Sequence, residues 1–332
     1  MDSYTVTSTV DNIVTTGITK IVINPTRNST APSENPTFEG RSFGTVGMYE
    51  KLRGRVYGQL NPNDTRNRLI ADLQFPPRND VGMIEYSMDF FILKPVNMST
   101  SNHKLFFEVN NRGYKVSGSF SEMSGGNNPT TAKDAGRAFL LNQGYTIAWS
   151  GWDPEVTTTG DRDLLRIFLP TTTNSDNSSI TGPSYEYIVF DYPSSTSYTT
   201  AYNTSSTDAT RTTLTMKCHL TDPPIIIPPS NWTWTSNNTI SLLPRNTTFQ
   251  QSWIYELTYI AQDPYVAGIG FAVTRDFVSF LRSARTDNPL AGDIKRTISW
   301  SASQPARYMN DFIWLGFNED LNGQLVFDGV FN

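Results

Sequence analysis

Alternation of apolar and polar positions dominates the early part of the chain. Residues 53–60 and 84–93 alternate over stretches of strand length, and the turn-forming residues 61–64 follow the first stretch. Such alternation is typical of strands with one face toward a core, so it predicts antiparallel β structure here. A shorter apolar run, residues 18–23, predicts a single strand within the otherwise polar lead segment of residues 1–40.

A strand, a helix and a second strand are predicted next. Residues 105–109 are mostly apolar, residues 131–143 have a helical pattern that stops at Gly144, and residues 145–149 form a buried apolar run. This order predicts a right-handed parallel crossover. The loop after the first strand then opens at the carboxyl edge of the sheet, where α/β folds bind their ligands.

Residues 155–250 differ in character from the rest of the chain. They are rich in Thr and Ser and show little helical periodicity, which predicts a β-rich insertion or lid. Beyond them, apolar residues spaced by three and four within residues 265–285 predict a helix with one apolar face. A strand over residues 298–300 follows, then a second helix, and a further strand is predicted over residues 324–327.

The sequence thus predicts an α/β fold with a mostly parallel sheet, N-terminal antiparallel strands and a β-rich insertion. Its predicted segments are residues 1–40 (lead), 41–154 (first strands and first crossover), 155–250 (insertion) and 251–332 (the rest of the core).

Ser303 lies between the strand predicted at residues 298–300 and a helix opening. That setting is typical of a nucleophile elbow, a tight turn that holds a serine in strained backbone above a sheet. The small residues Ser301 and Ala306 suit such crowding, whereas Pro305 disfavours helical backbone at the residue before it. A Ser-rich turn without catalytic role is the alternative interpretation.

Six short blocks stand in a distinctive order along the chain: residues 44–54, 76–79, 110–113, 144–152, 268–276 and 315–320. Together they resemble the bacterial and fungal family called alpha/beta hydrolase domain-containing proteins. The resemblance runs from about Gly40 to the last residue and is weakest over residues 155–250.

The resemblance implies an α/β-hydrolase fold and serine-based hydrolysis of an ester or related acyl bond. In that family the elbow reads G-x-S-Q-S-G-R, which places the nucleophile on Ser303. Ser301, Pro305 and Ala306 depart from that pattern.

The resemblance also implies where the oxyanion hole lies. The N–H of Gln304, directly after the nucleophile, supplies one donor, and an N–H of Asn111, Arg112 or Gly113 supplies the other. A plain Asn-Gly type turn is the alternative for the second group.

The catalytic base is absent from its expected place. A serine hydroxyl needs a histidine that takes its proton and a carboxylate that orients the histidine. In the family both follow the nucleophile, but His103 and His219 precede Ser303 here. Asp311 and Asp320 follow it and are predicted to have helix-surface or cap roles.

Two explanations follow. In the first, the chain is the N-terminal portion of a longer serine hydrolase, lacks the C-terminal part of the fold, and has negligible turnover by itself. In the second, it is a non-catalytic protein that binds glycan or lipid on the hydrolase shell. Trp232 and Trp234, which alternate on one strand face, are the candidate ligand contacts, and packing beneath a loop is their alternative role.

Charge and cysteine content exclude several classes of function. The net charge is −5 and no Lys/Arg run occurs, which argues against nucleic-acid binding. Cys218 is the single cysteine, so an internal disulfide framework and a cysteine-based zinc site are not expected. His219 is adjacent and is predicted on the opposite face of a strand, so no metal or other cofactor is expected.

No apolar run approaches the length of a membrane span or forms a signal-peptide core in the first twenty residues. Eight N-x-[ST] sequons, at Asn28, Asn63, Asn97, Asn177, Asn203, Asn231, Asn237 and Asn246, would suit a secreted glycoprotein. The compartment is therefore left open between cytoplasm and secretion. The expected partner is a small ester-like substrate, whose identity, like the oligomeric state, the sequence does not determine.

Overall fold

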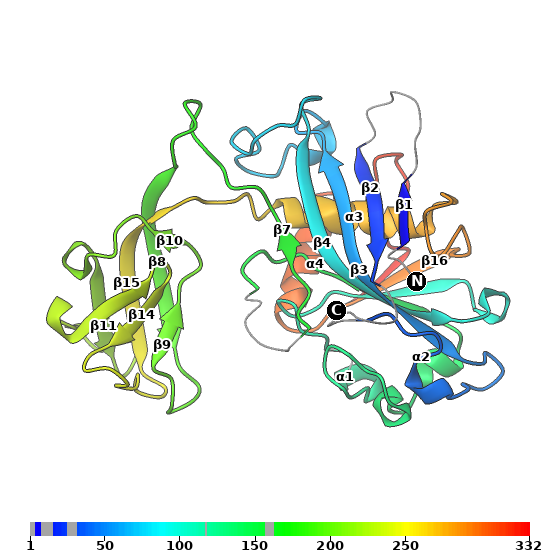
Figure 1. Cartoon of the computed structure of the whole chain (residues 1–332), viewed down its shortest axis with the longest axis horizontal. Helices are drawn as coiled ribbons and strands as arrows, with labels where there is room; N and C mark the ends of the chain where they lie inside the picture. Colours follow the sequence, from blue (N-terminus) through cyan, green and yellow to red (C-terminus); the bar gives the residue numbers. More distant parts are fainter. Residues whose placement is uncertain (1–3, 8–15, 25–31, 117, 157–162) are drawn as a thin grey trace. The chain divides into compact units, whose positions relative to one another are not determined.

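The computed structural model describes residues 4–7, 16–24, 32–116, 118–156 and 163–332. The chain divides into two compact units, each described here by itself (Figure 1). Unit 1 comprises Met1–Gln74, Arg78–Pro170 and Val266–Asn332, and unit 2 comprises Phe75–Pro77 and Thr171–Tyr265. Parts of the predicted lead segment, including the sequon at Asn28, lie outside the described residues.

Unit 1 is built on a mixed sheet, for which the described residues give the order β1-β2-β3-β4-β6-β5-β16-β17, with β7 paired to β4. The first four strands pair antiparallel, whereas β6, β5, β16 and β17 are parallel to one another. The strands are β1 (Tyr4–Thr7), β2 (Gly17–Ile23), β3 (Tyr49–Leu60), β4 (Ile84–Pro95), β5 (Lys104–Glu108), β6 (Thr146–Ser150), β7 (Ile167–Phe168), β16 (Arg296–Trp300) and β17 (Gly329–Phe331). The predicted α/β class, with antiparallel strands ahead of a parallel core, is confirmed.

Two long helices accompany this sheet. Helix α3 (Ile269–Arg282) lies across the sheet (Figure 1) and buries Val273 and Phe277 in a core shared with Ile21 and Phe90. Helix α4 (Gln304–Trp314) follows β16. The other helical segments of unit 1 are short: α1 (Gly118–Ser121), α2 (Phe139–Asn142) and the 3-10 turns η1 (Phe38–Gly40), η2 (Thr65–Asn67), η3 (Met98–Thr100) and η4 (Ala132–Ala135).

The single helix predicted over residues 131–143 is wrong, because η4 and α2 are separate turns. Between them, Gly136 has a φ of 57° and Ala138 a φ of 55°. A Cβ at Gly136 would lie only 2.1 Å from the carbonyl oxygen of Glu122, so the chain passes too close to the preceding segment for a side chain. This tertiary approach overrides the local helical pattern.

The strand predicted over residues 324–327 is also misplaced. Those residues leave a turn in which Asp320 Oδ1 accepts hydrogen bonds from the backbone N–H groups of Asn322 and Gln324. Pairing with β16 begins only at Gly329. An aspartate that binds nearby N–H groups competes with strand formation, and the ladder therefore starts later.

Unit 2 is β-rich, in agreement with the fold class predicted for the insertion, while the segment limits themselves stay a prediction. A sheet of order β10-β15-β11-β12, with β8 paired to β15, accompanies a smaller sheet of order β13-β14-β9. The strands are β8 (Thr181–Val189), β9 (Ser197–Thr199), β10 (Asn203–Thr204), β11 (Thr213–Lys217), β12 (Ile225–Ile226), β13 (Trp232–Ser236), β14 (Thr239–Leu242) and β15 (Ile254–Gln262), with 3-10 turns η5 (Ala209–Arg211) and η6 (Pro229–Asn231).

Candidate active site

The carboxyl ends of three parallel strands define the candidate site. β5 lies between β6 and β16 and is parallel to both, so their following loops leave from the same edge of the sheet. The backbone N–H of Val109 donates to the carbonyl oxygen of Trp300 over 3.0 Å, which ties the exits of β5 and β16 together. Residues 110–113, residues 151–155 and Ser303 all follow these strand ends.

Ser303 joins β16 to α4 in a strained backbone conformation. Its φ is 64° and its ψ is −122°, a combination that a residue with a side chain seldom adopts. The residue is exposed, so a reagent can reach its hydroxyl. A strained serine at a strand-to-helix junction is the geometry that the elbow interpretation requires.

The residues on either side of Ser303 fit the limited space of this turn. Ser301 is 1% exposed, and its N–H donates to Phe331 O over 3.1 Å while its hydroxyl bonds to Asn332. A small side chain is therefore needed at position 301, although serine replaces the family's glycine there. Pro305 lies in the first turn of α4, where the missing N–H removes no helical hydrogen bond.

Two of the predicted oxyanion-hole donors have no acceptor among the described residues. The Gln304 N–H is in the first turn of α4, where helical N–H groups point out of the helix end. In the β5 loop, Asn111 N–H donates to Tyr114 O over 2.8 Å and Gly113 N–H donates to Asn110 Oδ1 over 2.7 Å. Of the three predicted loop donors, only the Arg112 N–H is left over.

The side chain of Arg112 connects the β5 loop to the β6 loop. Its guanidinium lies 2.9 Å from Asp153 Oδ2 and 2.5 Å from Glu155 Oε2. Partial burial alone would lower the pKa of Arg112, but the two carboxylates more than offset it and raise that pKa. Arg112 therefore stays charged and holds its loop in place.

Buried contacts fix the remainder of the β5 loop. Asn110 is fully buried, donates to Ser150 O over 2.7 Å, and accepts at its carbonyl from Trp152 Nε1 over 2.9 Å. Gly113 has a φ of 87°, and a Cβ there would lie 2.9 Å from Val156 Cγ1. The sequence analysis assigned no role to Asn110, Asp153 or Glu155, although Asn110 opens the block at residues 110–113 and Asp153 directly follows the block at residues 144–152.

Neither histidine is placed beside Ser303 by the described contacts. His103 immediately precedes β5 and lies at the amino edge of the sheet, where its Nδ1 is 2.8 Å from Asp293 Oδ1. Five strand residues at about 3.3 Å each separate that edge from the carboxyl edge, on the order of 15 Å. His219 belongs to unit 2.

The other predicted residues have structural surroundings. Asp311 is exposed on α4, and Asp320 holds the turn described above. Trp232 and Trp234 are 1% and 6% exposed and belong to the hydrophobic core of unit 2. A ligand could contact these indole rings only if that core opened.

The predicted arrangement of Cys218 and His219 on opposite strand faces is wrong. β11 ends at Lys217, so both residues lie in the following turn. Cys218 Sγ is 3.9 Å from His219 Nε2 as a result. Alternation of side chains applies only within a strand, and the strand ends one residue too early.

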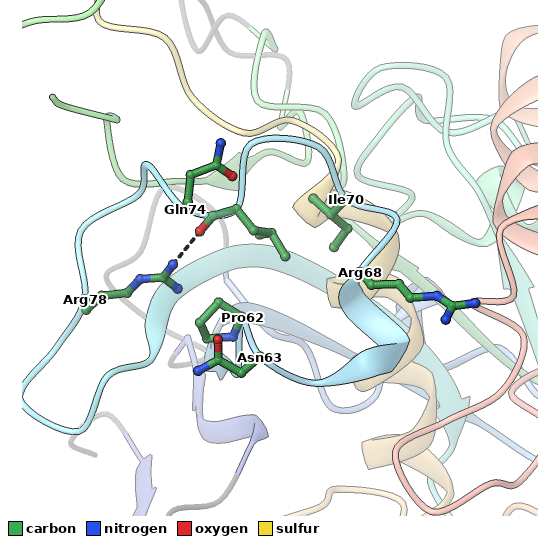
Figure 2. A pocket seen from close by; sticks show the side chains of 7 residues that line it. Pro62, Asn63, Arg68, Ile70, Gln74 and Arg78 are labelled. Carbon is green, nitrogen blue, oxygen red and sulfur yellow. Dashed lines mark hydrogen bonds between the residues drawn. The ribbon is translucent and has the colours of Figure 1, made fainter. Parts of the chain in front are cut away.

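A pocket that the sequence did not predict lies in the loop after β3. β3 and β6 both run antiparallel to β4, so β3 ends at the same sheet edge as the strands that carry the candidate site. The pocket has a volume of about 240 Å³ and is lined by Pro62, Asn63, Arg68, Ile70, Leu73, Gln74 and Arg78 (Figure 2). Arg78 donates to Leu73 O over 2.5 Å, and burial lowers the pKa of its guanidinium. Arg78 belongs to the block at residues 76–79, and that block was the feature of the sequence that could have indicated this pocket.

The protein has an α/β fold in which a serine with strained backbone lies between a strand and a helix. Residues 235–332 match the model of a family described as alpha/beta hydrolase domain. This match includes Ser303 and Gln304, and it confirms the resemblance to the alpha/beta hydrolase domain-containing family. No curated protein and no solved structure matches the chain. Within the described residues, no helix has the length and apolar character needed to cross a membrane.

Proposed function

We propose that unit 1 carries the nucleophile of a serine hydrolase that acts on an ester or related acyl bond. The observation that carries this proposal is the strained, exposed backbone of Ser303 between β16 and α4. Strain of this kind persists only where the surrounding structure imposes it, and it is concentrated at functional sites. The family match over residues 235–332 supports the same chemistry.

The proposed oxyanion hole consists of the Gln304 and Arg112 backbone N–H groups. Both lack an acceptor among the described residues, whereas the neighbouring N–H groups of Asn111 and Gly113 are already used. Donors fixed in advance around a developing negative charge supply a large part of the rate enhancement in acyl transfer. The ion pairs of Arg112 with Asp153 and Glu155 support that loop.

The proton of Ser303 needs an acceptor for turnover. Attack of Oγ on the acyl carbon forms a C–O bond while the hydroxyl proton leaves, and a histidine normally takes it. Within unit 1 the described histidine, His103, is at the opposite edge of the sheet and is bonded to Asp293. We therefore expect negligible turnover from this chain by itself, several orders of magnitude below that of a complete triad.

A fluorophosphonate probe tests the nucleophile assignment. We expect slow labelling that peptide mapping locates at Ser303 and that Ser303→Ala abolishes. Ser252→Ala is a matched control, because Ser252 is also exposed with a φ of 64° but lies in unit 2. Labelling at another residue, or none after prolonged incubation, would refute the assignment. Rapid labelling at Ser303 would instead refute the expected lack of turnover.

A second candidate function is ligand binding on a hydrolase shell without catalysis. The location of His103 away from Ser303 favours it, as do Ser301, Pro305 and Ala306 in the elbow. Glycan arrays and lipid vesicles would identify such a ligand. Binding that survives Ser303→Ala, together with absent fluorophosphonate labelling, would support this function over hydrolysis.

A further inference from the structure

The turn after β11 brings together three side chains of complementary chemistry. Cys218 Sγ lies 3.9 Å from His219 Nε2, and His219 Nδ1 lies 3.1 Å from Asp222 Oδ2. The imidazole therefore has a thiol at one ring nitrogen and a carboxylate at the other. When Nδ1–H donates to a carboxylate, the neutral ring keeps Nε2 free to accept a proton. A nucleophile, a base and an orienting acid are thus present in order.

Backbone contacts hold this arrangement in place. Asp222 N–H donates to His219 O over 3.1 Å, and His219 N–H donates to Asp222 Oδ2 over 2.9 Å. The His219 backbone N–H first, and its ring N–H second, hold the pKa of Asp222 below its ordinary value. Pro223 and Pro224 follow with restricted φ, which limits the chain after the turn.

The surroundings leave the thiol accessible. Cys218 is exposed and is the single cysteine of the chain. The neighbouring charge of Lys217 is paired with Glu256 over 3.2 Å, and Glu256 also accepts from Tyr185 Oη over 2.7 Å. Among the described residues, His219 is the titratable group that contacts the thiol, and Asp222 contacts His219 in turn.

We propose that Cys218 is a thiol–disulfide exchange site for small disulfides, with His219 as its base and Asp222 as the positioning residue. The Cys218 proton passes to His219 Nε2, and Sγ attacks one sulfur of an RS–SR molecule. A new S–S bond forms to Cys218, the original S–S bond breaks, and the departing RS⁻ takes the proton from Nε2. The disulfide is the oxidant, because the leaving thiol carries away the electron pair of the broken bond.

This site is independent of the proposed hydrolase function, since it shares no residue with the elbow. A thiol needs less assistance than a serine hydroxyl, because a thiolate is intrinsically nucleophilic and exchange requires no oxyanion hole. An exposed turn can therefore carry the chemistry.

The first experiment measures reaction of the full chain with 4,4′-dithiodipyridine, followed by absorbance of the released thiopyridone. Because no other cysteine exists in the sequence, the signal reports Cys218 alone. At about pH 6, we expect the folded protein to react roughly tenfold faster than the same protein unfolded in guanidinium chloride. Equal rates in the folded and unfolded protein would overturn the proposal.

Variants then separate the roles of the two partners. His219→Gln is expected to lower the rate to about that of the unfolded chain and to move the pH–rate profile toward higher pH, whereas Asp222→Asn lowers it by roughly threefold. His103→Gln is the matched control and keeps the wild-type rate. An unchanged pH–rate profile in both His219→Gln and Asp222→Asn would overturn the assignment of the base. Circular dichroism checks that each variant is folded. If His219→Gln does not fold, the pH–rate profile of Asp222→Asn alone tests the assignment.

Glutathione disulfide tests the proposed substrate class. Mass spectrometry of the intact chain should show a mixed disulfide that peptide mapping places at Cys218 and that a thiol reductant reverses. Reaction with dithiodipyridine but not with glutathione disulfide would show a reactive thiol that does not exchange with this class of disulfide, and would overturn that part of the proposal.

Discussion

Two turns of this protein carry the side chains that we propose as nucleophiles, Ser303 and Cys218, and the groups around them differ. The turn at Ser303 has strained backbone and is followed by the Gln304 N–H, which has no acceptor among the described residues, but the described contacts of unit 1 bring no histidine to it. At the turn of Cys218, the thiol contacts a histidine and that histidine contacts a carboxylate. Among the described residues, however, no helix begins directly after this turn to supply N–H groups from its first turn. A serine needs both sets of groups, whereas a thiol can react with the second set alone. The comparison predicts that the type of nucleophile decides how many supporting groups its site requires.

The largest expected effect is a loss of stability in unit 1, which contains Ser303 but not Cys218. Arg275 and Asp276 form a buried pair at 2.9 Å on α3, with Arg275 1% exposed. Arg275→Leu leaves Asp276 buried without its cation and should cost about 3–5 kcal/mol of unfolding free energy. Denaturant unfolding measures this loss. Fluorophosphonate labelling of Ser303 should fall with it, while the exchange rate of Cys218 is retained.

Arg296→Leu is the control for that experiment. The pair between Arg296 and Asp328 is also short, at 2.8 Å, but the Arg296 side chain is 68% exposed. Its removal should cost less than about 1 kcal/mol. Similar losses in the two variants, or a parallel fall in Cys218 reactivity, would contradict the contrast between the units.

A smaller effect is expected from crowding in the β5 loop. Gly113 has a φ of 87° and little space for a Cβ, so Gly113→Ala should cost about 1–3 kcal/mol. Gly323 has a φ of 75°, and nothing lies within 4 Å of the position that a Cβ would take there. Gly323→Ala should therefore cost only the backbone strain, about 1 kcal/mol. Denaturation midpoints of the two variants measure the difference. Equal losses would show that the loop holding Arg112 adapts to a side chain.

The smallest effect concerns pH. Burial raises the pKa of Asp276, although Arg275 and Tyr86 act to lower it. The folded state therefore binds a proton more tightly than the unfolded state at this group. Stability should fall as pH rises from the ordinary carboxyl range through the raised pKa of Asp276. Comparison of wild type with Asp276→Asn across that range isolates the effect, and parallel profiles would show that Asp276 does not contribute.

Local patterns in the sequence determined the main elements of unit 1. The alternating runs at residues 53–60 and 84–93 became β3 and β4, and the apolar spacing within residues 265–285 became α3. The strand-to-helix junction at Ser303 was also visible. These features depend on periodicity and on turn residues, which act over a few positions of the chain.

Tertiary structure alone decided the details on which chemistry depends. The predicted helix is interrupted at Gly136, because the carbonyl oxygen of Glu122 lies only 2.1 Å from the position that a Cβ would take there. The choice of Arg112 as the free N–H donor follows from hydrogen bonds that close only when the β5 loop folds. The meeting of Cys218 with His219 depends on where β11 ends. Contacts between distant segments contribute free energies comparable with local conformational preferences. The sequence pattern by itself therefore does not determine these contacts or the exact residue at which a strand ends.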